Sequence, residues 1–298
     1  MIGRLLAAAL LLTLVITTSS AFMRLNQTIG SCADWTSCRD RASSSSTAHS
    51  APNVAVGIAR VVHRLAASTV GMLVLIIVAL LWKHSPGMRT ASAVLLLLTA
   101  SLAVLGRFTP SELPVVTLAN LLGGMAIAGT LGWLRVATSW QPPARTQRPV
   151  LFALMVLSLQ IAIGGLVSAR DAALSCPSFG DCLETFRTFD WHGFDVLRAN
   201  ASLSRTAPRT IYGTHQLFAL FAVIAVLAVW SRVRKDLHQR RPRVILLGLV
   251  ILQIVLGAAM AIAGSSITLA VTHNLCAVLI IIVLATMLRA GVVKGEMI

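Results

Sequence analysis

The chain consists of long apolar runs separated by short stretches that carry nearly all of the charged residues. A helix that crosses the hydrocarbon core of a bilayer needs about 20 predominantly apolar residues. Charge-free runs close to this length are Leu5–Met23, Leu65–Trp82, Ala91–Gly106, Leu113–Leu134, Val150–Ala169 and Thr210–Ser231. Each of these runs therefore predicts one transmembrane helix.

The last apolar run, Val244–Leu288, continues for 45 residues without an acidic residue, lysine or arginine, which is enough for two spans. Ala263-Gly264-Ser265-Ser266 lies in its middle and favours a turn there. The strands of a membrane β-barrel would alternate between apolar and polar residues, and these runs do not. The pattern thus predicts an all-α membrane protein with eight transmembrane helices.

Composition supports this prediction, because 56% of the 298 residues are apolar and only 12% are charged. A soluble domain has about 25% charged residues, so a soluble enzyme is excluded, and the apolar content also excludes disorder. Five cysteines are too few for a disulfide scaffold. The net charge of +15 would suggest nucleic-acid binding, but the basic residues lie between apolar runs, as in polytopic membrane proteins.

The distribution of charge predicts the orientation. If the N-terminus is inside, the inside segments hold 14 of the 25 basic residues and two of the 10 acidic residues. These segments are also short, which is where the positive-inside rule is strongest. Both termini are therefore predicted to be cytoplasmic. Two long loops, about Arg24–Arg64 and Arg170–Arg209, are predicted to face outward.

These two loops contain four of the five cysteines, as two Cys-x5-Cys pairs. Outward loops lie in an oxidising compartment, where disulfides persist, so the disulfides Cys32–Cys38 and Cys176–Cys182 are predicted. Whether they only staple the loops or also exchange with thiols stays open. Zinc is disfavoured, because its cysteine pairs usually lie two to four residues apart. Cys276 lies within a helix and is predicted to be a packed thiol.

The second half of the chain repeats the first. Matching features recur at offsets of 144, 152 and 153 residues, in the pairs Cys32 and Cys176, His63 and His215, and Asn120 and His273. Repeats with an even number of helices run parallel, related by an axis along the membrane normal. Two four-helix repeats are predicted, at 1–140 and 141–298. Met1–Ala21 also fits a cleaved signal peptide, but its counterpart in the second repeat disfavours that alternative.

Three of the seven histidines, His63, His215 and His273, lie near the outer ends of predicted helices. Ionisable groups at membrane depth are costly and indicate function, although a histidine can also serve an interhelical hydrogen bond. His215 and His273 are predicted at matched depth. Paired axial ligation of a haem in the apolar bundle is therefore favoured for them. His192 lies among outer-loop aromatic residues and is a weaker candidate for contact with a substrate or haem edge.

With these features in place, the chain resembles the haem A synthase family of cytochrome oxidase assembly proteins. The matching segments cover nearly the whole chain: Arg24-Leu25, Ser31-Cys32-Ala33-Asp34-Trp35 with Cys38, His63-Arg64-Leu65, Leu122-Gly123-Gly124, Gly164-Gly165-Leu166-Val167-Ser168, Ala173-Leu174-Ser175-Cys176-Pro177 with Cys182, Gln253, Leu256-Gly257 and Thr272-His273-Asn274. No single segment is highly specific, and the resemblance rests on their order.

The resemblance implies an eight-helix bundle with pseudo-twofold symmetry that oxidises a ring methyl of haem O to the formyl group of haem A. It implies haem b as a cofactor in the C-terminal half, with His215 and His273 as iron ligands. The N-terminal half is then the substrate side, with His63 as a ligand of the substrate haem iron. Expected partners are haem O, a haem O synthase, a haem-copper oxidase and the lipid bilayer, without nucleic acid.

Two positions depart from the family, and both lie in the N-terminal half. The family has a histidine on the fourth helix where this chain has Asn120, and a glutamate three residues before His63 where it has Arg60. Asparagine is a poor iron ligand, and an arginine cannot act as a base. His63, Asn120 and Arg60 are the substrate-side candidates, and the sequence assigns no catalytic residue.

Two alternatives remain open. The first is a non-catalytic haem-binding assembly or electron-transfer protein, because the two departures fall in the catalytic half. The second is a membrane thiol-disulfide oxidoreductase that uses the outer cysteines, but it leaves His215 and His273 unexplained. A transporter fits least, since the inner halves of the helices lack polar groups. No Arg/Ser-rich transit segment precedes the first helix, which favours a bacterial cytoplasmic membrane over a mitochondrion.

Overall fold

The computed structural model describes residues 1–28, 54–109, 113–136, 144–176, 185–200, 203–204, 206–234, 239–264 and 266–289. Within these ranges the chain is all-helical, and eight helices are long and apolar enough to cross a membrane. They are α1 (Ile2–Thr28), α3 (Val54–Leu81), α4 (Pro86–Leu105), α5 (Pro114–Arg135), α6 (Ala144–Ala169), α8 (Ala207–Val233), α9 (Arg240–Ala263) and α10 (Ile267–Arg289). The predicted eight-helix, multi-pass architecture is confirmed.

Local sequence explains several helix ends. Pro86 and Pro114 are the first residues of α4 and α5, where the missing N–H costs no hydrogen bond and the fixed φ suits the helix. Gly264 separates α9 from α10 with a φ of 82°, which L side chains rarely adopt. The predicted turn in the long apolar run is therefore confirmed.

The first outward loop is shorter than predicted. Arg24 lies within α1, and α3 begins at Val54, so that Arg60, His63 and Arg64 belong to the helix. The prediction of a loop from Arg24 to Arg64 was wrong because it ended each span at the first charge. An arginine near a helix end leaves the backbone helical when its head group finds a partner or reaches the interface, and Nε of Arg24 donates to Oγ of Ser168 in α6 (3.0 Å). The second loop agrees within a few residues.

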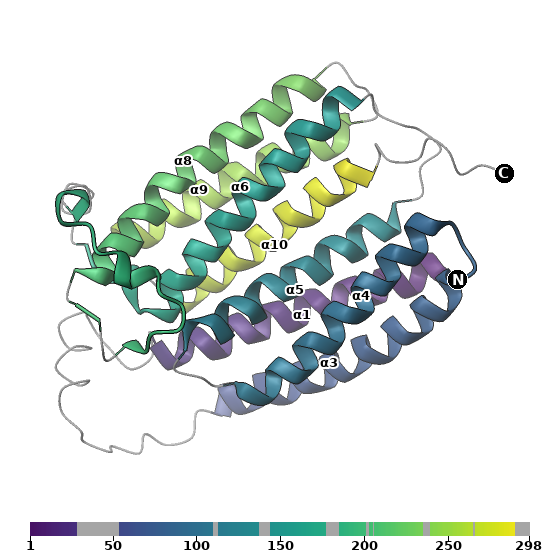
Figure 1. Cartoon of the computed structure of the whole chain (residues 1–298), viewed down its shortest axis with the longest axis horizontal. Helices are drawn as coiled ribbons and strands as arrows, with labels where there is room; N and C mark the ends of the chain where they lie inside the picture. Colours follow the sequence, from purple (N-terminus) through teal and green to yellow (C-terminus); the bar gives the residue numbers. More distant parts are fainter. Residues whose placement is uncertain are drawn as a thin grey trace.

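The helices form two groups of four (Figure 1). In the first group, α1 packs against α3 and α5, and α4 packs against the same two helices. In the second group, α6 packs against α8 and α10, and α9 packs against the same two. The groups meet where α10 contacts α5 and α1, and where α5 contacts α6. α1 begins and α10 ends at the same end of the bundle (Figure 1).

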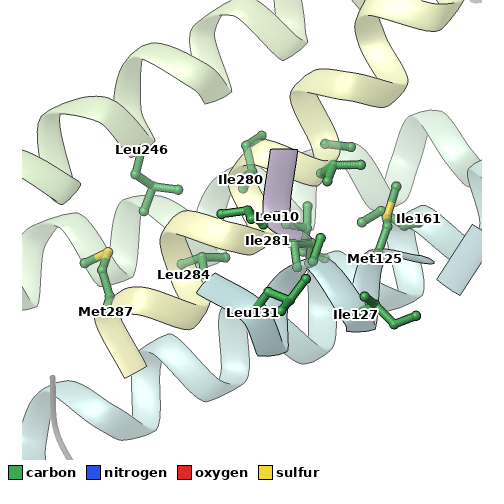
Figure 2. Close-up of a cluster of buried hydrophobic side chains, with 14 of the residues drawn as sticks. Leu10, Met125, Ile127, Leu131, Ile161, Leu246, Ile280, Ile281, Leu284 and Met287 are labelled. Atoms are coloured by element: carbon green, nitrogen blue, oxygen red, sulfur yellow. The ribbon is translucent and has the colours of Figure 1, made fainter. Parts of the chain in front are cut away.

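The centre of the bundle is the contact between α5 and α10. Figure 2 shows the buried apolar cluster there, to which α1, α6 and α9 also contribute. Two glycines of α5 permit the close approach: a Cβ at Gly129 would lie 3.2 Å from Ile281 Cγ2, and one at Gly132 would lie 3.0 Å from Ile282 Cγ2. Small residues serve this purpose at membrane helix interfaces. Outward-facing side chains such as Met72 and Leu97 are apolar and exposed, as a bilayer requires.

The end of the bundle opposite the N-terminus carries short 3-10 helices, among them η3 (Ala172–Leu174), η4 (Thr185–Thr188) and η5 (Trp191–Phe194). The buried Arg170 holds this region together. Its Nη1 donates to the carbonyl of Arg198 (2.7 Å) and to Asn200 Oδ1 (2.8 Å), and its Nη2 donates to the carbonyl of Asp195 (2.6 Å). Burial lowers the pKa of Arg170, although a guanidinium remains protonated. The segment is thus fixed over the ends of α6 and α8.

Candidate functional site

His215 and His273 lie at similar depth in helices that face each other across the second group. At 1.5 Å per residue, His215 is about 12 Å from the start of α8 and His273 about 9 Å from the start of α10. Both helices pack against α6 and α9, so they occupy opposite corners of the four-helix group. The structure therefore places the two histidines at similar depth on facing helices, as the sequence predicts.

Each of these histidines is contacted by a glutamine from a neighbouring helix. Gln160 of α6 places Nε2 3.1 Å from Nδ1 of His215, and the same Nε2 donates to the carbonyl of His215 (3.0 Å). Gln253 of α9 places Nε2 2.9 Å from Nε2 of His273. All four helices of the group thus contribute one polar side chain, and each imidazole has one ring nitrogen held by an amide.

Two glycines leave room beside the imidazole rings. A Cβ at Gly164 of α6 would lie 2.9 Å from Cε1 of His215, closer than real Cβ contacts. A Cβ at Gly257 of α9 would lie 3.6 Å from Cε1 of His273, an ordinary contact distance. Gly164 lies one helical turn after Gln160, and Gly257 one turn after Gln253, so that the same face of each helix supplies both the amide and the space.

Three buried polar atoms without a described partner lie at this site. Of eight such side-chain atoms in the described part of the chain, three belong to the glutamines and histidines above: Gln160 Oε1, Gln253 Oε1 and His273 Nδ1. Burying an unpaired polar group in an apolar environment costs about 2–7 kcal/mol. Native proteins keep such groups rarely and for a reason, and a polar or metal-bearing ligand at this site would account for them.

The donor set suits a haem. Among the described residues, no group of three or more His, Cys, Asp and Glu side chains could hold a metal ion. Haem iron needs only axial protein ligands, because the macrocycle supplies the remaining four. His215 and His273 offer two imidazoles, and each has a second ring nitrogen that is not held by the glutamine. Residues of this type in an apolar bundle fit an iron held between α8 and α10.

The candidates in the first group are arranged differently. His63 is half-buried in α3, and Arg60 is exposed one turn earlier. Nδ2 of Asn120 in α5 donates to Oγ1 of Thr109 (3.0 Å), across the connection from α4. Among the described residues, no hydrogen bond joins His63 to Asn120. That both line one cavity stays a prediction.

The first group also lacks the amides and glycines of the second. At the offset of 144 residues, Gln160 and Gly164 correspond to Ile16 and Ser20. At the offset of 153 residues, Gln253 and Gly257 correspond to Ala100 and Val104. Gln160 is not among the site residues predicted from the sequence, although a lone amide in a charge-free run indicates an interhelical contact.

The cysteines are described only in part. Cys176 is disulfide-bonded, while Cys32, Cys38 and Cys182 lie outside the described residues. The pairings therefore stay predictions. Cys276 is a buried free thiol whose Sγ donates to the carbonyl of Leu249 (3.2 Å), as predicted for a packed cysteine. His192 is exposed on η5.

Comparisons with known proteins identify the family of the chain. The family described as cytochrome oxidase assembly protein, COX15-CtaA, matches residues 3–285. A haem A synthase of Shewanella oneidensis is 25% identical, over 95% of this chain and 94% of its own length. A haem A synthase of Rhizorhabdus wittichii is 32% identical, over 58% of this chain and 49% of its own length. One of Brucella anthropi is 27% identical, over 44% and 36%. Because the family match runs from α1 into α10, the chain belongs to the COX15-CtaA family of cytochrome oxidase assembly proteins.

Proposed function

We propose that this protein is a haem A synthase, an oxidoreductase that converts haem O to haem A for cytochrome oxidase assembly. The observation that carries the proposal is the match to the family and to a haem A synthase over nearly the whole chain. The two-histidine site between α8 and α10 supports it. A haem O synthase, which supplies the substrate, and a haem-copper oxidase, which receives the product, are the expected partners.

The C-terminal half, 141–298, is proposed to hold a resident haem b through His215 and His273. When bound, such a haem supplies one-electron transfer. The protein's own contribution is to fix both imidazoles. The contacts of Gln160 and Gln253 support this role, because each holds one ring nitrogen, and Gly164 supports it because a side chain there would meet the ring of His215.

The N-terminal half, 1–140, is proposed to bind haem O. Converting a methyl to a formyl group adds one oxygen atom and removes four electrons and four protons when water supplies the oxygen. The substrate must enter and the product must leave, so a loosely held macrocycle is required. His63 offers one iron ligand, and the glutamines that contact His215 and His273 in the other half are replaced by Ile16 and Ala100 here. A site with fewer fixed ligands fits an exchangeable haem.

Arg60 is proposed to pair with a propionate of the substrate haem. A guanidinium binds carboxylates through two parallel hydrogen bonds and does not act as a base. Arg60 is exposed one turn before His63 on α3, which places its head group nearer the outer end of the bundle than the imidazole. This position suits a contact with the polar edge of a porphyrin whose iron is at His63.

The two halves are proposed to be parallel repeats in a bacterial cytoplasmic membrane, with both termini in the cytoplasm. The matched packing supports the repeat: α1, α3, α4 and α5 have the same neighbour relations as α6, α8, α9 and α10. The charge distribution of the loops supports the orientation. In this arrangement both haem sites lie toward the outer side, as do the cysteine-bearing loops.

Co-expression with a haem O synthase tests the function. The protein is purified, its haems are extracted, and the products are identified by chromatography. Haem A beside haem b is expected. Haem b with unconverted haem O would contradict the proposal and favour the non-catalytic haem-binding alternative.

Replacing Asn120 with histidine tests the substrate half. Asn120→His gives α5 the iron ligand that His273 supplies in α10, so haem O bound at His63 should change from high-spin to six-coordinate, low-spin iron. Electron paramagnetic resonance of the haem O-loaded variant measures the change, with Thr109→Ala as the control that removes the hydrogen-bond partner of Asn120 without adding an iron ligand. Identical spectra for wild type, Asn120→His and His63→Ala would show that this half does not hold haem through these positions.

The outer cysteines are expected to form Cys32–Cys38 and Cys176–Cys182. Closing so short a loop should contribute less than the roughly 3 kcal/mol estimated for a 15-residue loop. We therefore expect Cys32→Ser and Cys176→Ser to disturb haem handling more than thermal stability. Alkylation with and without reductant, followed by peptide mapping, checks the pairing. Free thiols at these positions in protein from its native membrane would contradict it.

A further inference from the structure

Gln160 and Gln253 have no assigned role, yet they are the side chains in contact with the ring nitrogens of the paired histidines. They come from different helices, α6 and α9, and reach histidines that are 55 and 20 residues away in sequence. Both have a buried amide oxygen, Oε1, for which no described residue is a hydrogen-bond partner. The same unpaired atom beside each histidine indicates a shared purpose.

The chemistry of an iron-bound imidazole accounts for this unpaired oxygen. A neutral imidazole that binds a metal through one nitrogen carries its proton on the other, and that N–H needs an acceptor. In Gln160 and Gln253 the unpaired oxygen Oε1 is such an acceptor, and it belongs to the amide that already contacts a ring nitrogen. The terminal torsion of glutamine is broad and roughly two-fold, so rotation about it exchanges Nε2 for Oε1. Gln253 makes no second hydrogen bond in the described structure, whereas rotation of Gln160 gives up its bond to the carbonyl of His215.

We propose that Gln160 and Gln253 are positioning residues whose amide oxygens accept the N–H at Nδ1 of His215 and at Nε2 of His273, which leaves Nε2 of His215 and Nδ1 of His273 to bind haem iron. The proposal rests on the proposed function, because it requires a haem at this site. The acceptor fixes the orientation of each ring and raises the basicity of the ligand. A more basic axial ligand stabilises the ferric state and so lowers the reduction potential of the haem.

The proposal predicts opposite effects for two substitutions at each glutamine. Gln253→Leu removes the acceptor, so it should raise the midpoint potential of the low-spin haem and weaken haem binding by about 10- to 100-fold. Gln253→Glu keeps an acceptor and makes it stronger, so it should retain the haem and lower the potential. Gln160→Leu and Gln160→Glu should behave in the same way, with smaller shifts. A residue with a merely structural role would not shift the potential in opposite directions.

Potentiometric titration of the purified holoprotein measures these shifts. Gln216→Leu is the matched control: it removes an amide next to His215 that hydrogen-bonds Tyr212 instead of the imidazole, so its potential should stay near that of the wild type. If a leucine variant does not yield holoprotein, the glutamate variant still decides, because an unchanged or raised potential there overturns the proposal. Shifts of the same sign for leucine and glutamate also overturn it. A wild type without low-spin haem would instead refute the proposed function.

Discussion

Replacing His215 or His273 with alanine is expected to abolish the low-spin haem spectrum of the purified protein. Each substitution leaves the iron with one protein ligand at most, and the remaining haem should be high-spin and weakly held. The loss of haem affinity should exceed about 10- to 100-fold, which is the loss typically caused by removing a hydrogen-bond partner of a metal ligand. Absorption and electron paramagnetic resonance spectra, with haem content per protein, measure the effect.

His192→Ala provides the matched control for these two variants. His192 is an exposed histidine at the same end of the bundle, and its side chain is not part of the paired site. The His192→Ala variant should therefore keep the low-spin haem spectrum of the wild type. If both His215→Ala and His273→Ala retained the low-spin spectrum, the ligand assignment would be wrong.

Gly164→Ala is expected to weaken haem binding in the C-terminal half, although it adds one methyl group. The added Cβ would lie 2.9 Å from Cε1 of His215, and Gln160 already holds that ring at Nδ1. The imidazole must therefore move or the helices must separate. Overpacking of this kind costs about 1–3 kcal/mol, which corresponds to about 5- to 150-fold in affinity. Titration of haem into the apoprotein measures this loss.

Two other glycines, Gly257 of α9 and Gly165 of α6, serve as controls for Gly164→Ala. At Gly257 the added Cβ would lie 3.6 Å from Cε1 of His273, so Gly257→Ala should bind haem nearly as the wild type does. At Gly165 it would meet a flexible leucine end, Cδ2 of Leu121 at 2.9 Å, which lies between the two groups of helices. Equal haem affinity in Gly164→Ala and Gly257→Ala would mean that His215 is not held where the structure places it.

The sequence was sufficient to predict the fold because each helix has its own local signal. The charge-free runs predicted all eight helices, and Gly264 predicted the division of the longest run. The helix starts were predicted less well. α3 begins at Val54 and not near Leu65, because charged residues near a helix end do not interrupt its hydrogen bonds.

The candidate site was predictable only in part. His215 and His273 stand out as ionisable residues in apolar helices. Their glutamines do not, because the contact between Gln160 and His215 depends on how α6 and α8 are rotated against each other. That rotation is set by packing between distant helices, including the room at Gly164. The hydrogen bond between Asn120 and Thr109 likewise depends on the path of the chain between α4 and α5, and the sequence of that connection has no strong structural signal.

The most direct test of the central claim is the haem composition of membranes from cells that make this chain together with a haem O synthase. Chromatography of the extracted haems should show haem A with the wild type. With His63→Ala it should show haem O and no haem A, while the low-spin haem held by His215 and His273 remains. Haem O without any haem A in the wild-type membranes would contradict the account, because the chain would then bind haem without oxidising it.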